Sequence, residues 1–303
     1  MKFGKLKSIE NIEFSLPPDT EASNVFLEKL EKDDEKATIY IGCTGWSMRE
    51  WVGKVYPLKT KTADYLHHYS RQFNTIEFNT THYRIPNGET VEKWRTKSAD
   101  DFRFCPKIPQ LVSHRNDLGL TSGKMLEFCE SIQELGEKMG CCFIQLPPYF
   151  APDRSPVLKQ FIEKFPNHIP LAIEFRHEDW FKNNALKPIA DLLRKKGMPI
   201  VITDVAGRRD VLHMEVTSEI AMVRFVGNDL HSTDFERIDE WVQRLKVWIS
   251  KGVKNIYFFC HEPDNIMSPD LCKYLFEKVS SFENVQTRGP KFIEPKGEQL
   301  ELF

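Results

Sequence analysis

From Thr38 onward, short apolar runs alternate with longer amphipathic stretches. Near-continuous apolar runs of four or five residues are typical of parallel strands that are buried on both faces. Eight such runs occur, and they cover Thr38–Gly42, Thr75–Phe78, Phe102–Cys105, Cys142–Gln145, Leu171–Phe175, Ile200–Thr203, Ala221–Phe225 and Ile256–Cys260.

The stretches between the runs predict helices, because their apolar residues recur at a spacing of three and four. They cover Thr62–Phe73, Glu89–Ser98, Lys124–Met139, Pro156–Phe165, Leu186–Lys196, Glu240–Ser250 and Pro269–Val279. Only the stretch from Arg208 to Glu219 has no clear helical pattern. Strand–helix units of about 30 residues predict an α/β fold, a single TIM-type (β/α)8 barrel. An open, doubly wound sheet is the alternative, but the first turn lacks its glycine-rich phosphate-binding pattern.

The predicted barrel occupies residues 38–283. Residues 1–37 are polar and predict an N-terminal extension with one short helix, from about Glu21 to Lys32. Residues 284–303 include Gly289, Pro290, Pro295 and Gly297, which favour an extended C-terminal tail.

Composition narrows the functional classes. The chain has 42 basic and 44 acidic residues and a formal net charge of −2. This balance provides no global field that would draw the chain onto nucleic acid or an anionic membrane. No segment has the apolar length of a signal peptide or a membrane span. The seven cysteines include no C-x-x-C pair and fit buried, reduced thiols, so we expect a cytoplasmic protein that does not enter membranes.

Charged residues interrupt the apolar runs near the ends of the predicted strands. Burial of an isolated charge is costly, yet Glu77, Glu174 and Arg224 lie inside runs, and Lys107 and Asp204 lie just past the ends of two others. The active site of a TIM-type barrel lies at the C-terminal ends of its strands. We therefore predict that Glu77, Glu174 and Asp204 are catalytic and share one pocket. The alternative is a ring of structural salt bridges.

Further polar residues at the same strand ends are candidates for substrate binding: Asn79, Tyr83, Arg84, Lys107, His114, Gln145, Arg176, His177, Arg224 and His261. His177 and His261 could instead cap helices at the surface. The acids and histidines at these ends are also ligand types for zinc, manganese or magnesium. No short histidine spacing links them, so a divalent metal cofactor is a hypothesis without an assigned ligand set.

Several longer motifs resemble one family. Ile41–Ser47 (IGCTGWS), Phe73–Arg84 (FNTIEFNTTHYR) and Ala172–His177 (AIEFRH) resemble the signatures of the YecE-like family, the domain of unknown function 72, and so do Gln145–Pro148 and His261–Asn265. The resemblance covers about residues 38–280. It implies a TIM-type barrel but no established reaction. It also implies a relation to endonuclease-IV-like barrels, which cut DNA with a metal cluster.

The chain ends in Gln299-Leu-Glu-Leu-Phe303, which resembles the pentapeptide by which bacterial replication and repair proteins bind the sliding clamp. Two apolar side chains after a proline- and glycine-containing spacer can enter an apolar groove. We therefore predict that Gln299, Leu300, Leu302 and Phe303 bind a clamp. The alternative is that Leu302 and Phe303 pack on the barrel.

Three functional hypotheses follow. The first is an enzyme that acts on a phosphate-containing substrate, extending to metal-assisted phosphodiester hydrolysis in nucleic-acid repair. The second is a metal-free acid–base enzyme that acts on a sugar or sugar phosphate. The third is a non-catalytic binding module that the tail recruits to the clamp.

Overall fold

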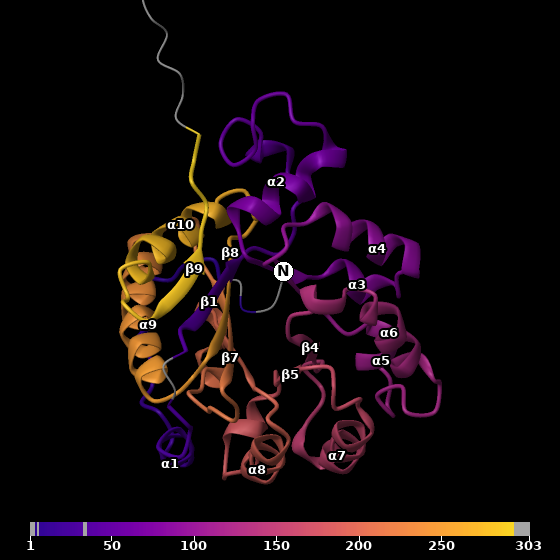
Figure 1. Ribbon diagram of the computed structural model, residues 1–303. Coiled ribbons are helices and arrows are strands. Elements are labelled where there is room, and N and C mark those ends of the chain that lie inside the picture. The colour runs from indigo at the N-terminus through magenta and orange to yellow at the C-terminus, as the bar shows by residue number, and fades with distance from the viewer. Residues whose placement is uncertain (1–3, 5, 33–34, 294–303) are drawn as a thin grey trace, which may run out of the picture.

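The computed structural model of the chain describes residues 4, 6–32 and 35–293. It is a mixed α/β fold in which helices surround parallel strands (Figure 1). The strands are β1 (Ala37–Gly42), β2 (Thr75–Phe78), β3 (Arg103–Pro106), β4 (Cys142–Gln145), β5 (Leu171–Glu174), β6 (Val201–Asp204), β7 (Ile220–Val226), β8 (Asn255–His261) and β9 (Val285–Arg288).

The α-helices lie on the outside of these strands in Figure 1. They are α1 (Glu21–Leu27), α2 (Tyr65–Gln72), α3 (Thr80–Tyr83), α4 (Gly88–Lys97), α5 (Gln110–Ser113), α6 (Lys124–Gln133), α7 (Ser155–Lys164), α8 (Lys187–Lys196), α9 (Ser232–Ser250) and α10 (Ser268–Val279). Short 3-10 helices add η1 (Arg49–Trp51), η2 (Thr62–Asp64), η3 (Gly136–Lys138), η4 (Pro152–Arg154), η5 (Glu178–Phe181) and η6 (Ala206–Val211).

All eight predicted strands form, but their pairing divides them among three parallel sheets. The largest sheet has the order β6-β7-β8-β1-β9, and β2-β3 and β4-β5 form two pairs. Isolated bridges link the neighbouring sheets, among them Lys107 with Phe143 and Ile173 with Ile200. One continuous ladder around a closed barrel, as the sequence predicted, is therefore not shown among the described residues.

Strand β9 explains the gap between β1 and β2. It pairs with Ala37–Tyr40 of β1, on the side away from β8. Strand β2 meets β1 at its far end, where the Glu77 amide donates to the Cys43 carbonyl at 3.0 Å. Beside β9, the Asn74 side chain accepts from the Ile41 amide and donates to the Ile39 carbonyl. The region expected to be an extended tail thus supplies a sheet strand.

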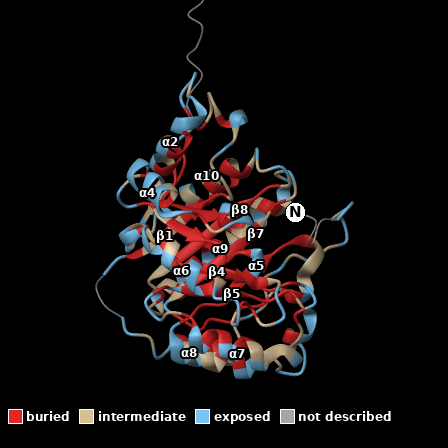
Figure 2. Ribbon diagram, turned by 90° about the vertical axis from the view of Figure 1, so that its right-hand side faces the viewer, coloured by how far each residue is buried: buried red, intermediate tan, exposed pale blue. Residues whose placement is uncertain are grey.

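Two apolar layers enclose the strands, and burial is concentrated there in Figure 2. The larger layer lies between strands and helices, and it includes Trp241 and Trp248 of α9. The smaller cluster lies on the other side of the strands and includes Phe143, Met222 and Phe259. The Phe143 ring lies below two cationic side chains, at 5.9 Å from Lys107 Nζ and 5.8 Å from the Arg224 guanidinium carbon. An apolar floor therefore supports the polar cluster described below.

All seven predicted helices occur, but α9 begins at Ser232, before the expected Glu240, and α6 ends at Gln133, before the expected Met139. Helices α3 and α5 were not predicted. Helix α1 ends at Leu27, earlier than expected, and the unclear stretch after Arg208 belongs partly to the kinked 3-10 helix η6. Among the described residues, no helix is both long and apolar enough to cross a membrane. All seven cysteines lie in the described part of the chain, are buried and form no disulfide.

The close approach of β1 to β2 can be tested at Gly42. A Cβ atom at this position would lie 2.2 Å from the Thr75 carbonyl oxygen, which is rigid backbone. We expect Gly42→Ala to lower the free energy of unfolding by about 2–3 kcal/mol, because an overpacked strand contact must separate. Gly45→Ala is the matched control, since no neighbouring atom would lie within 4 Å of its Cβ. Equal stability of the two variants in urea titrations would contradict the contact.

Candidate functional site

A fully buried arginine joins two buried carboxylates at the C-terminal ends of the strands. Arg224 of β7 donates through Nε and Nη2 to the two oxygens of Glu77, at 2.8 and 2.9 Å. Its Nη1 donates to both oxygens of Glu174, at 3.0 and 2.9 Å. The three residues are at most 1% exposed. The structure therefore brings together three of the predicted site residues.

Polar neighbours satisfy the remaining acceptor positions of both carboxylates. Glu77 accepts from Asn79 Nδ2 at 2.8 Å, and its Oε2 lies 2.7 Å from His261 Nε2. Glu174 is surrounded by three donors, Gln145 at 2.7 Å, Arg176 at 2.9 Å and Thr203 at 3.1 Å. Lys107 Nζ then donates to Gln145 Oε1 at 2.9 Å. We call these residues the Arg224 network: Glu77, Asn79, Lys107, Gln145, Glu174, Arg176, Thr203, Arg224 and His261.

Strand register explains why these side chains meet. Gln145 pairs with Glu174 in the β4–β5 ladder, and Thr203 pairs with Arg224 in the β6–β7 ladder. Paired residues of neighbouring strands direct their side chains to the same face. The network is therefore fixed by backbone pairing before any side-chain hydrogen bond is considered.

Asp204 does not join the network, which corrects the prediction that it shares a pocket with Glu77 and Glu174. Successive strand residues point to opposite faces, so the neighbour of Thr203 faces the helical layer. There, Asp204 accepts from Arg237 Nη2 and Trp241 Nε1 of α9, both at 2.8 Å, and from Arg209. The predicted run ends at Thr203, so sequence analysis treated Asp204 as a residue after the strand. Strand β6 includes Asp204, and the alternation of the strand therefore turns its side chain away from the network.

Both network carboxylates are held ionised. Burial alone would raise the pKa of Glu77, but Arg224 and His261 outweigh it and hold that pKa well below its usual range. Burial acts on Glu174 in the same way, and Arg224 and Arg176 bring its pKa down to about 2. Because every carboxylate oxygen already accepts hydrogen bonds, Glu77 and Glu174 are suited to orienting their partners.

The β3 side of the network is rich in cations. Burial, followed by the charge of Arg224, lowers the pKa of Lys107 to about 8. Burial and the Lys107 charge lower the pKa of His82 to about 4 and also lower that of His114. Lys107, Arg176 and Arg224 carry three positive charges against two on Glu77 and Glu174, which leaves one positive charge in excess. This side favours an anionic group.

A cavity of about 420 Å³ opens beside His261 and Asn79. Its wall includes Glu262, whose oxygens accept from the Asp229 and Leu230 amides at 2.8 and 3.3 Å. Burial, followed by the charge of Asp234, raises the pKa of Glu262 to about 7. Sequence analysis placed Glu262 at a strand end as a candidate metal ligand, but did not count it among the catalytic or substrate-binding residues.

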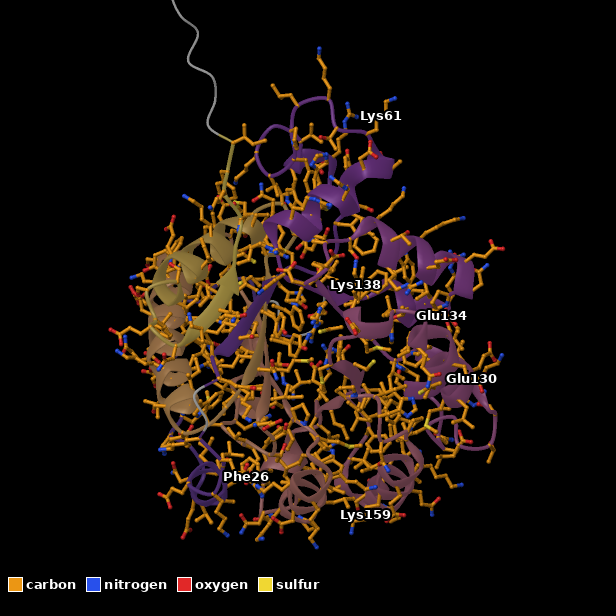
Figure 3. The ribbon with its side chains drawn as sticks, viewed as in Figure 1. Phe26, Lys61, Glu130, Glu134, Lys138 and Lys159 are labelled. Carbon is orange, nitrogen blue, oxygen red and sulfur yellow. The ribbon has the colours of Figure 1, made fainter. Side chains whose placement is uncertain are left out.

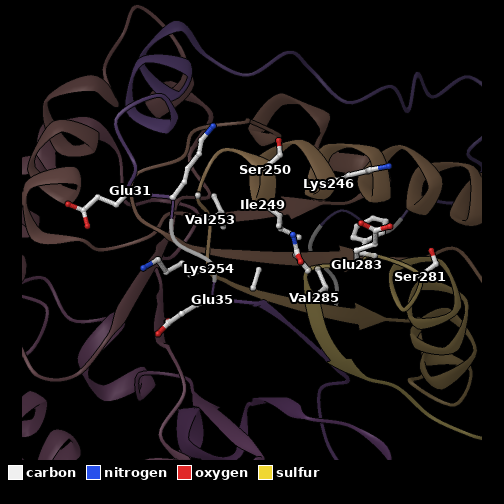
Figure 4. Close-up of a pocket in the computed structure, with 15 residues that line it drawn as sticks. Glu31, Glu35, Lys246, Ile249, Ser250, Val253, Lys254, Ser281, Glu283 and Val285 are labelled. Carbon is white, nitrogen blue, oxygen red and sulfur yellow. The ribbon is translucent and has the colours of Figure 1, made fainter.

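A larger cavity lies elsewhere among the described residues. It measures about 810 Å³ and lies at the N-terminal ends of the strands, beside Ala37, Lys254 and Val285 (Figure 4). These ends are opposite to the ones that carry the Arg224 network. The lysines and glutamates that line it have mixed charge, and conserved chemistry in parallel α/β folds is found at the other end. We therefore place the candidate site at the smaller cavity.

The remaining predicted site residues lie away from the centre of the Arg224 network or outside the described residues. Tyr83 and Arg84 are exposed, and no hydrogen bond from either to the Arg224 network occurs among the described residues. His177 caps η5, where its Nδ1 accepts from the Asp179 amide. His114 is half-buried, and its ring lies 5.7 Å from that of His82. The clamp-binding prediction falls on residues 299–303, which lie outside the described residues.

A metal ion does not fit the donor atoms of the network. Arg224 lies between the two carboxylates, and their oxygens are already engaged by cationic and neutral donors. In the part of the chain that the structure describes, no three histidine, cysteine or acidic side chains converge as a metal-binding group. We therefore assign no step to a metal.

The fold and the buried network define a class: a mixed α/β protein with a charged site at the C-terminal ends of parallel strands. The chain belongs to the family described as protein of unknown function DUF72, whose profile matches residues 40–294. It is 31% identical to the UPF0759 protein YecE of Escherichia coli K12 over 260 residues, 80% of this chain and 92% of that protein.

Two further relatives are more distant. The UPF0759 protein YunF of Bacillus subtilis is 27% identical over 166 residues, which cover 52% of this chain and 58% of that protein. A crystal structure of a DUF72 family protein from Enterococcus faecalis matches 84% of this chain and all of that chain, with a TM-score of 0.66 and 17% identity. This likeness supports the fold, and the family confirms the resemblance found in the sequence.

The ion pairs of Glu174 predict a pH-dependent stability. Its pKa of about 2 in the folded chain is below the value of about 4.3 expected in an unfolded chain. The carboxylate therefore stabilises the fold above about pH 4.3 by about 3 kcal/mol, and this contribution is lost as the pH falls toward 2. We expect Glu174→Gln to be destabilised at pH 7 by about that amount and to approach the wild type near pH 2.5.

Urea titrations across this pH range measure the difference. Glu130→Gln is the matched control, because Glu130 is exposed on α6, away from the strands (Figure 3). A destabilisation of Glu174→Gln that stays constant from pH 7 to pH 2.5 would show that the ion pairs do not hold the carboxylate ionised.

Proposed function

We propose that this chain is a metal-independent acid–base enzyme that acts on a small phosphate-bearing substrate, with His261 as the residue that transfers a proton. One observation carries the proposal. The His261 ring lines the 420 Å³ cavity while its Nε2 lies 2.7 Å from Glu77 Oε2. A histidine that touches both a cavity and a buried carboxylate has the arrangement that general acid–base catalysis requires.

Glu77 orients this histidine. Because the carboxylate is ionised, it accepts a proton-bearing Nε2, and the other ring nitrogen, Nδ1, is then the basic one. Among the described residues, no hydrogen-bond partner of Nδ1 occurs. Arg224 in turn fixes Glu77 through two hydrogen bonds. His261 is thus the catalytic residue of the proposal, and Glu77 and Arg224 are positioning residues.

The phosphate group is assigned to the cationic side. Lys107 and Arg176 are 6% and 8% exposed, and each is held by the network through Gln145 or Glu174. Cations fixed in this way bind a phosphate oxygen without losing much side-chain entropy. Glu174, predicted to be catalytic, holds the cations in place in this proposal.

We infer that β1–β8 enclose the Arg224 network as a (β/α)8 barrel. Support comes from the isolated bridges between β3 and β4 and between β5 and β6, and from the Glu77–Cys43 backbone bond between β2 and β1. Such an enclosure accounts for polar side chains from β2, β4, β5, β7 and β8 that meet at one point.

Metal-assisted cleavage of nucleic acid has less support, because Arg224 lies where a metal would bridge the carboxylates. The chain also has a net charge of −2, which offers no general attraction to a polyanion. Recruitment by a sliding clamp stays a separate prediction of the C-terminal pentapeptide.

The pKa of Lys107 predicts how anion binding depends on pH. Its amino group is charged below about pH 8 and neutral above, so affinity for inorganic phosphate should fall between pH 7 and pH 9. We expect Lys107→Met to lower the affinity about tenfold at pH 7 and to remove this pH dependence. Isothermal titration calorimetry measures both effects.

Lys159→Met serves as the control, because Lys159 is exposed on α7 on the outside of the molecule (Figure 3). Phosphate binding that is unchanged in Lys107→Met would remove Lys107 from the site.

Proton transfer by His261 can be followed without knowledge of the product. A panel of triose, pentose and hexose phosphates is incubated with the protein in D₂O, and exchange at carbon is read by NMR. We expect exchange in at least one ester, and a loss of about 100-fold or more in His261→Gln with phosphate affinity retained. Absence of exchange in every ester, or equal exchange in the variant, would reject the acid–base assignment.

A further inference from the structure

The N-terminal extension reaches the cavity beside His261. Leu6, Lys7, Ser8 and Ile9 line this cavity together with Asn79 and His261. The rest of the wall is formed by Thr44, which follows β1, and by residues at or after the ends of β6, β7 and β8. A segment far from the strand ends in sequence therefore supplies one side of the candidate site.

Two glycines fix the inner end of this segment. The Gly207 amide donates to the Gly4 carbonyl at 3.0 Å. A Cβ atom on Gly207 would lie 2.6 Å from that carbonyl oxygen, and one on Gly4 would lie 2.7 Å from Val205 Cγ2. Gly4 also has a φ of +74°, a conformation that favours glycine. The segment thus approaches the loop after β6 more closely than other residues would permit.

Phe14 fixes the outer end. Its carbonyl accepts from Arg209 Nη2 at 2.8 Å, and its ring lies 5.0 Å from the Arg237 guanidinium carbon and 5.5 Å from that of Arg209. Both arginines also bind Asp204. The buried carboxylate therefore fixes the two cations on which Phe14 rests, and this gives Asp204 a role that its position outside the Arg224 network left open.

Residues beyond Phe14 continue the attachment along α9. The Leu16 amide donates to Glu240 at 2.9 Å, and Arg244 donates to the Pro17 carbonyl at 3.0 Å. The family profile begins at residue 40, so Leu16 and Pro17 lie outside the matched region, whereas Glu240 and Arg244 lie inside it.

We propose that the N-terminal strap, the described residues between Gly4 and Asp19, is a wall of the substrate pocket that covers His261 and limits the size of the ligand admitted. Asp204, Arg209 and Arg237 are positioning residues that hold the strap through Phe14. The covering of His261 is independent of the proposed function, whereas the limit on ligand size rests on it.

Chemical modification of His261 tests the covering without any ligand. Wild type, Phe14→Ala and Phe26→Ala are treated with diethyl pyrocarbonate, and modification at His261 is quantified by mass spectrometry. Phe26→Ala is the matched control, because Phe26 lies on α1 and makes no contact with Arg209 or Arg237 among the described residues. We expect modification to be about tenfold faster in Phe14→Ala alone, because the strap opens locally. Equal rates in all three proteins would overturn the proposal.

A second variant tests the size limit while the N-terminal strap stays attached through Phe14. Leu6→Trp adds bulk to the wall, and Leu126→Trp is the control on the exposed surface of α6. We expect Leu6→Trp to weaken binding of a hexose phosphate about tenfold or more and to leave inorganic phosphate unchanged. Equal hexose phosphate affinity in the two variants would overturn the size limit. If the wild type binds no phosphate ester, the proposed function and the size limit fail, while the modification rates still decide the covering.

Discussion

The fold depends on how the Arg224 guanidinium is neutralised inside the strands. A buried cation without partners would cost several kcal/mol, and here two carboxylates from β2 and β5 share it. This requirement joins strands that belong to three different sheets. The same ion pairs keep both carboxylates charged, so the interaction that holds the strands together also fixes the charges of the candidate site.

The candidate site has two chemically different halves. Cations gather around Lys107 and Arg176, whereas the cavity beyond His261 is bordered by carboxylate and amide groups such as Asn228, Asp229 and Glu262. A ligand with an anionic end and a hydrogen-bonding body matches this division. His261 lines the cavity and contacts Glu77 of the Arg224 network, so in the proposed function it is the residue that links the two halves.

Sequence patterns predicted strands β1–β8 and the convergence of Glu77, Glu174 and Arg224, because burial and strand register impose both. Asp204 was misplaced because β6 extends one residue further than its apolar run, and a shift of one residue reverses the face. The strap could not be predicted, since Gly4 and Phe14 are held by contacts with residues about 200 positions away, for which local sequence has no signal. Strand β9 was missed for the same reason.

Strand β9 has a consequence for biosynthesis. Its ladder with β1 joins positions separated by 248 residues, so the first strand of the sheet has an open edge until synthesis has passed β9. Contacts of such long range slow folding and leave unpaired backbone groups available to other chains. A nascent chain of this protein therefore passes through a long interval in which the edge of β1 is vulnerable to aggregation, and pairing with β9 ends that interval.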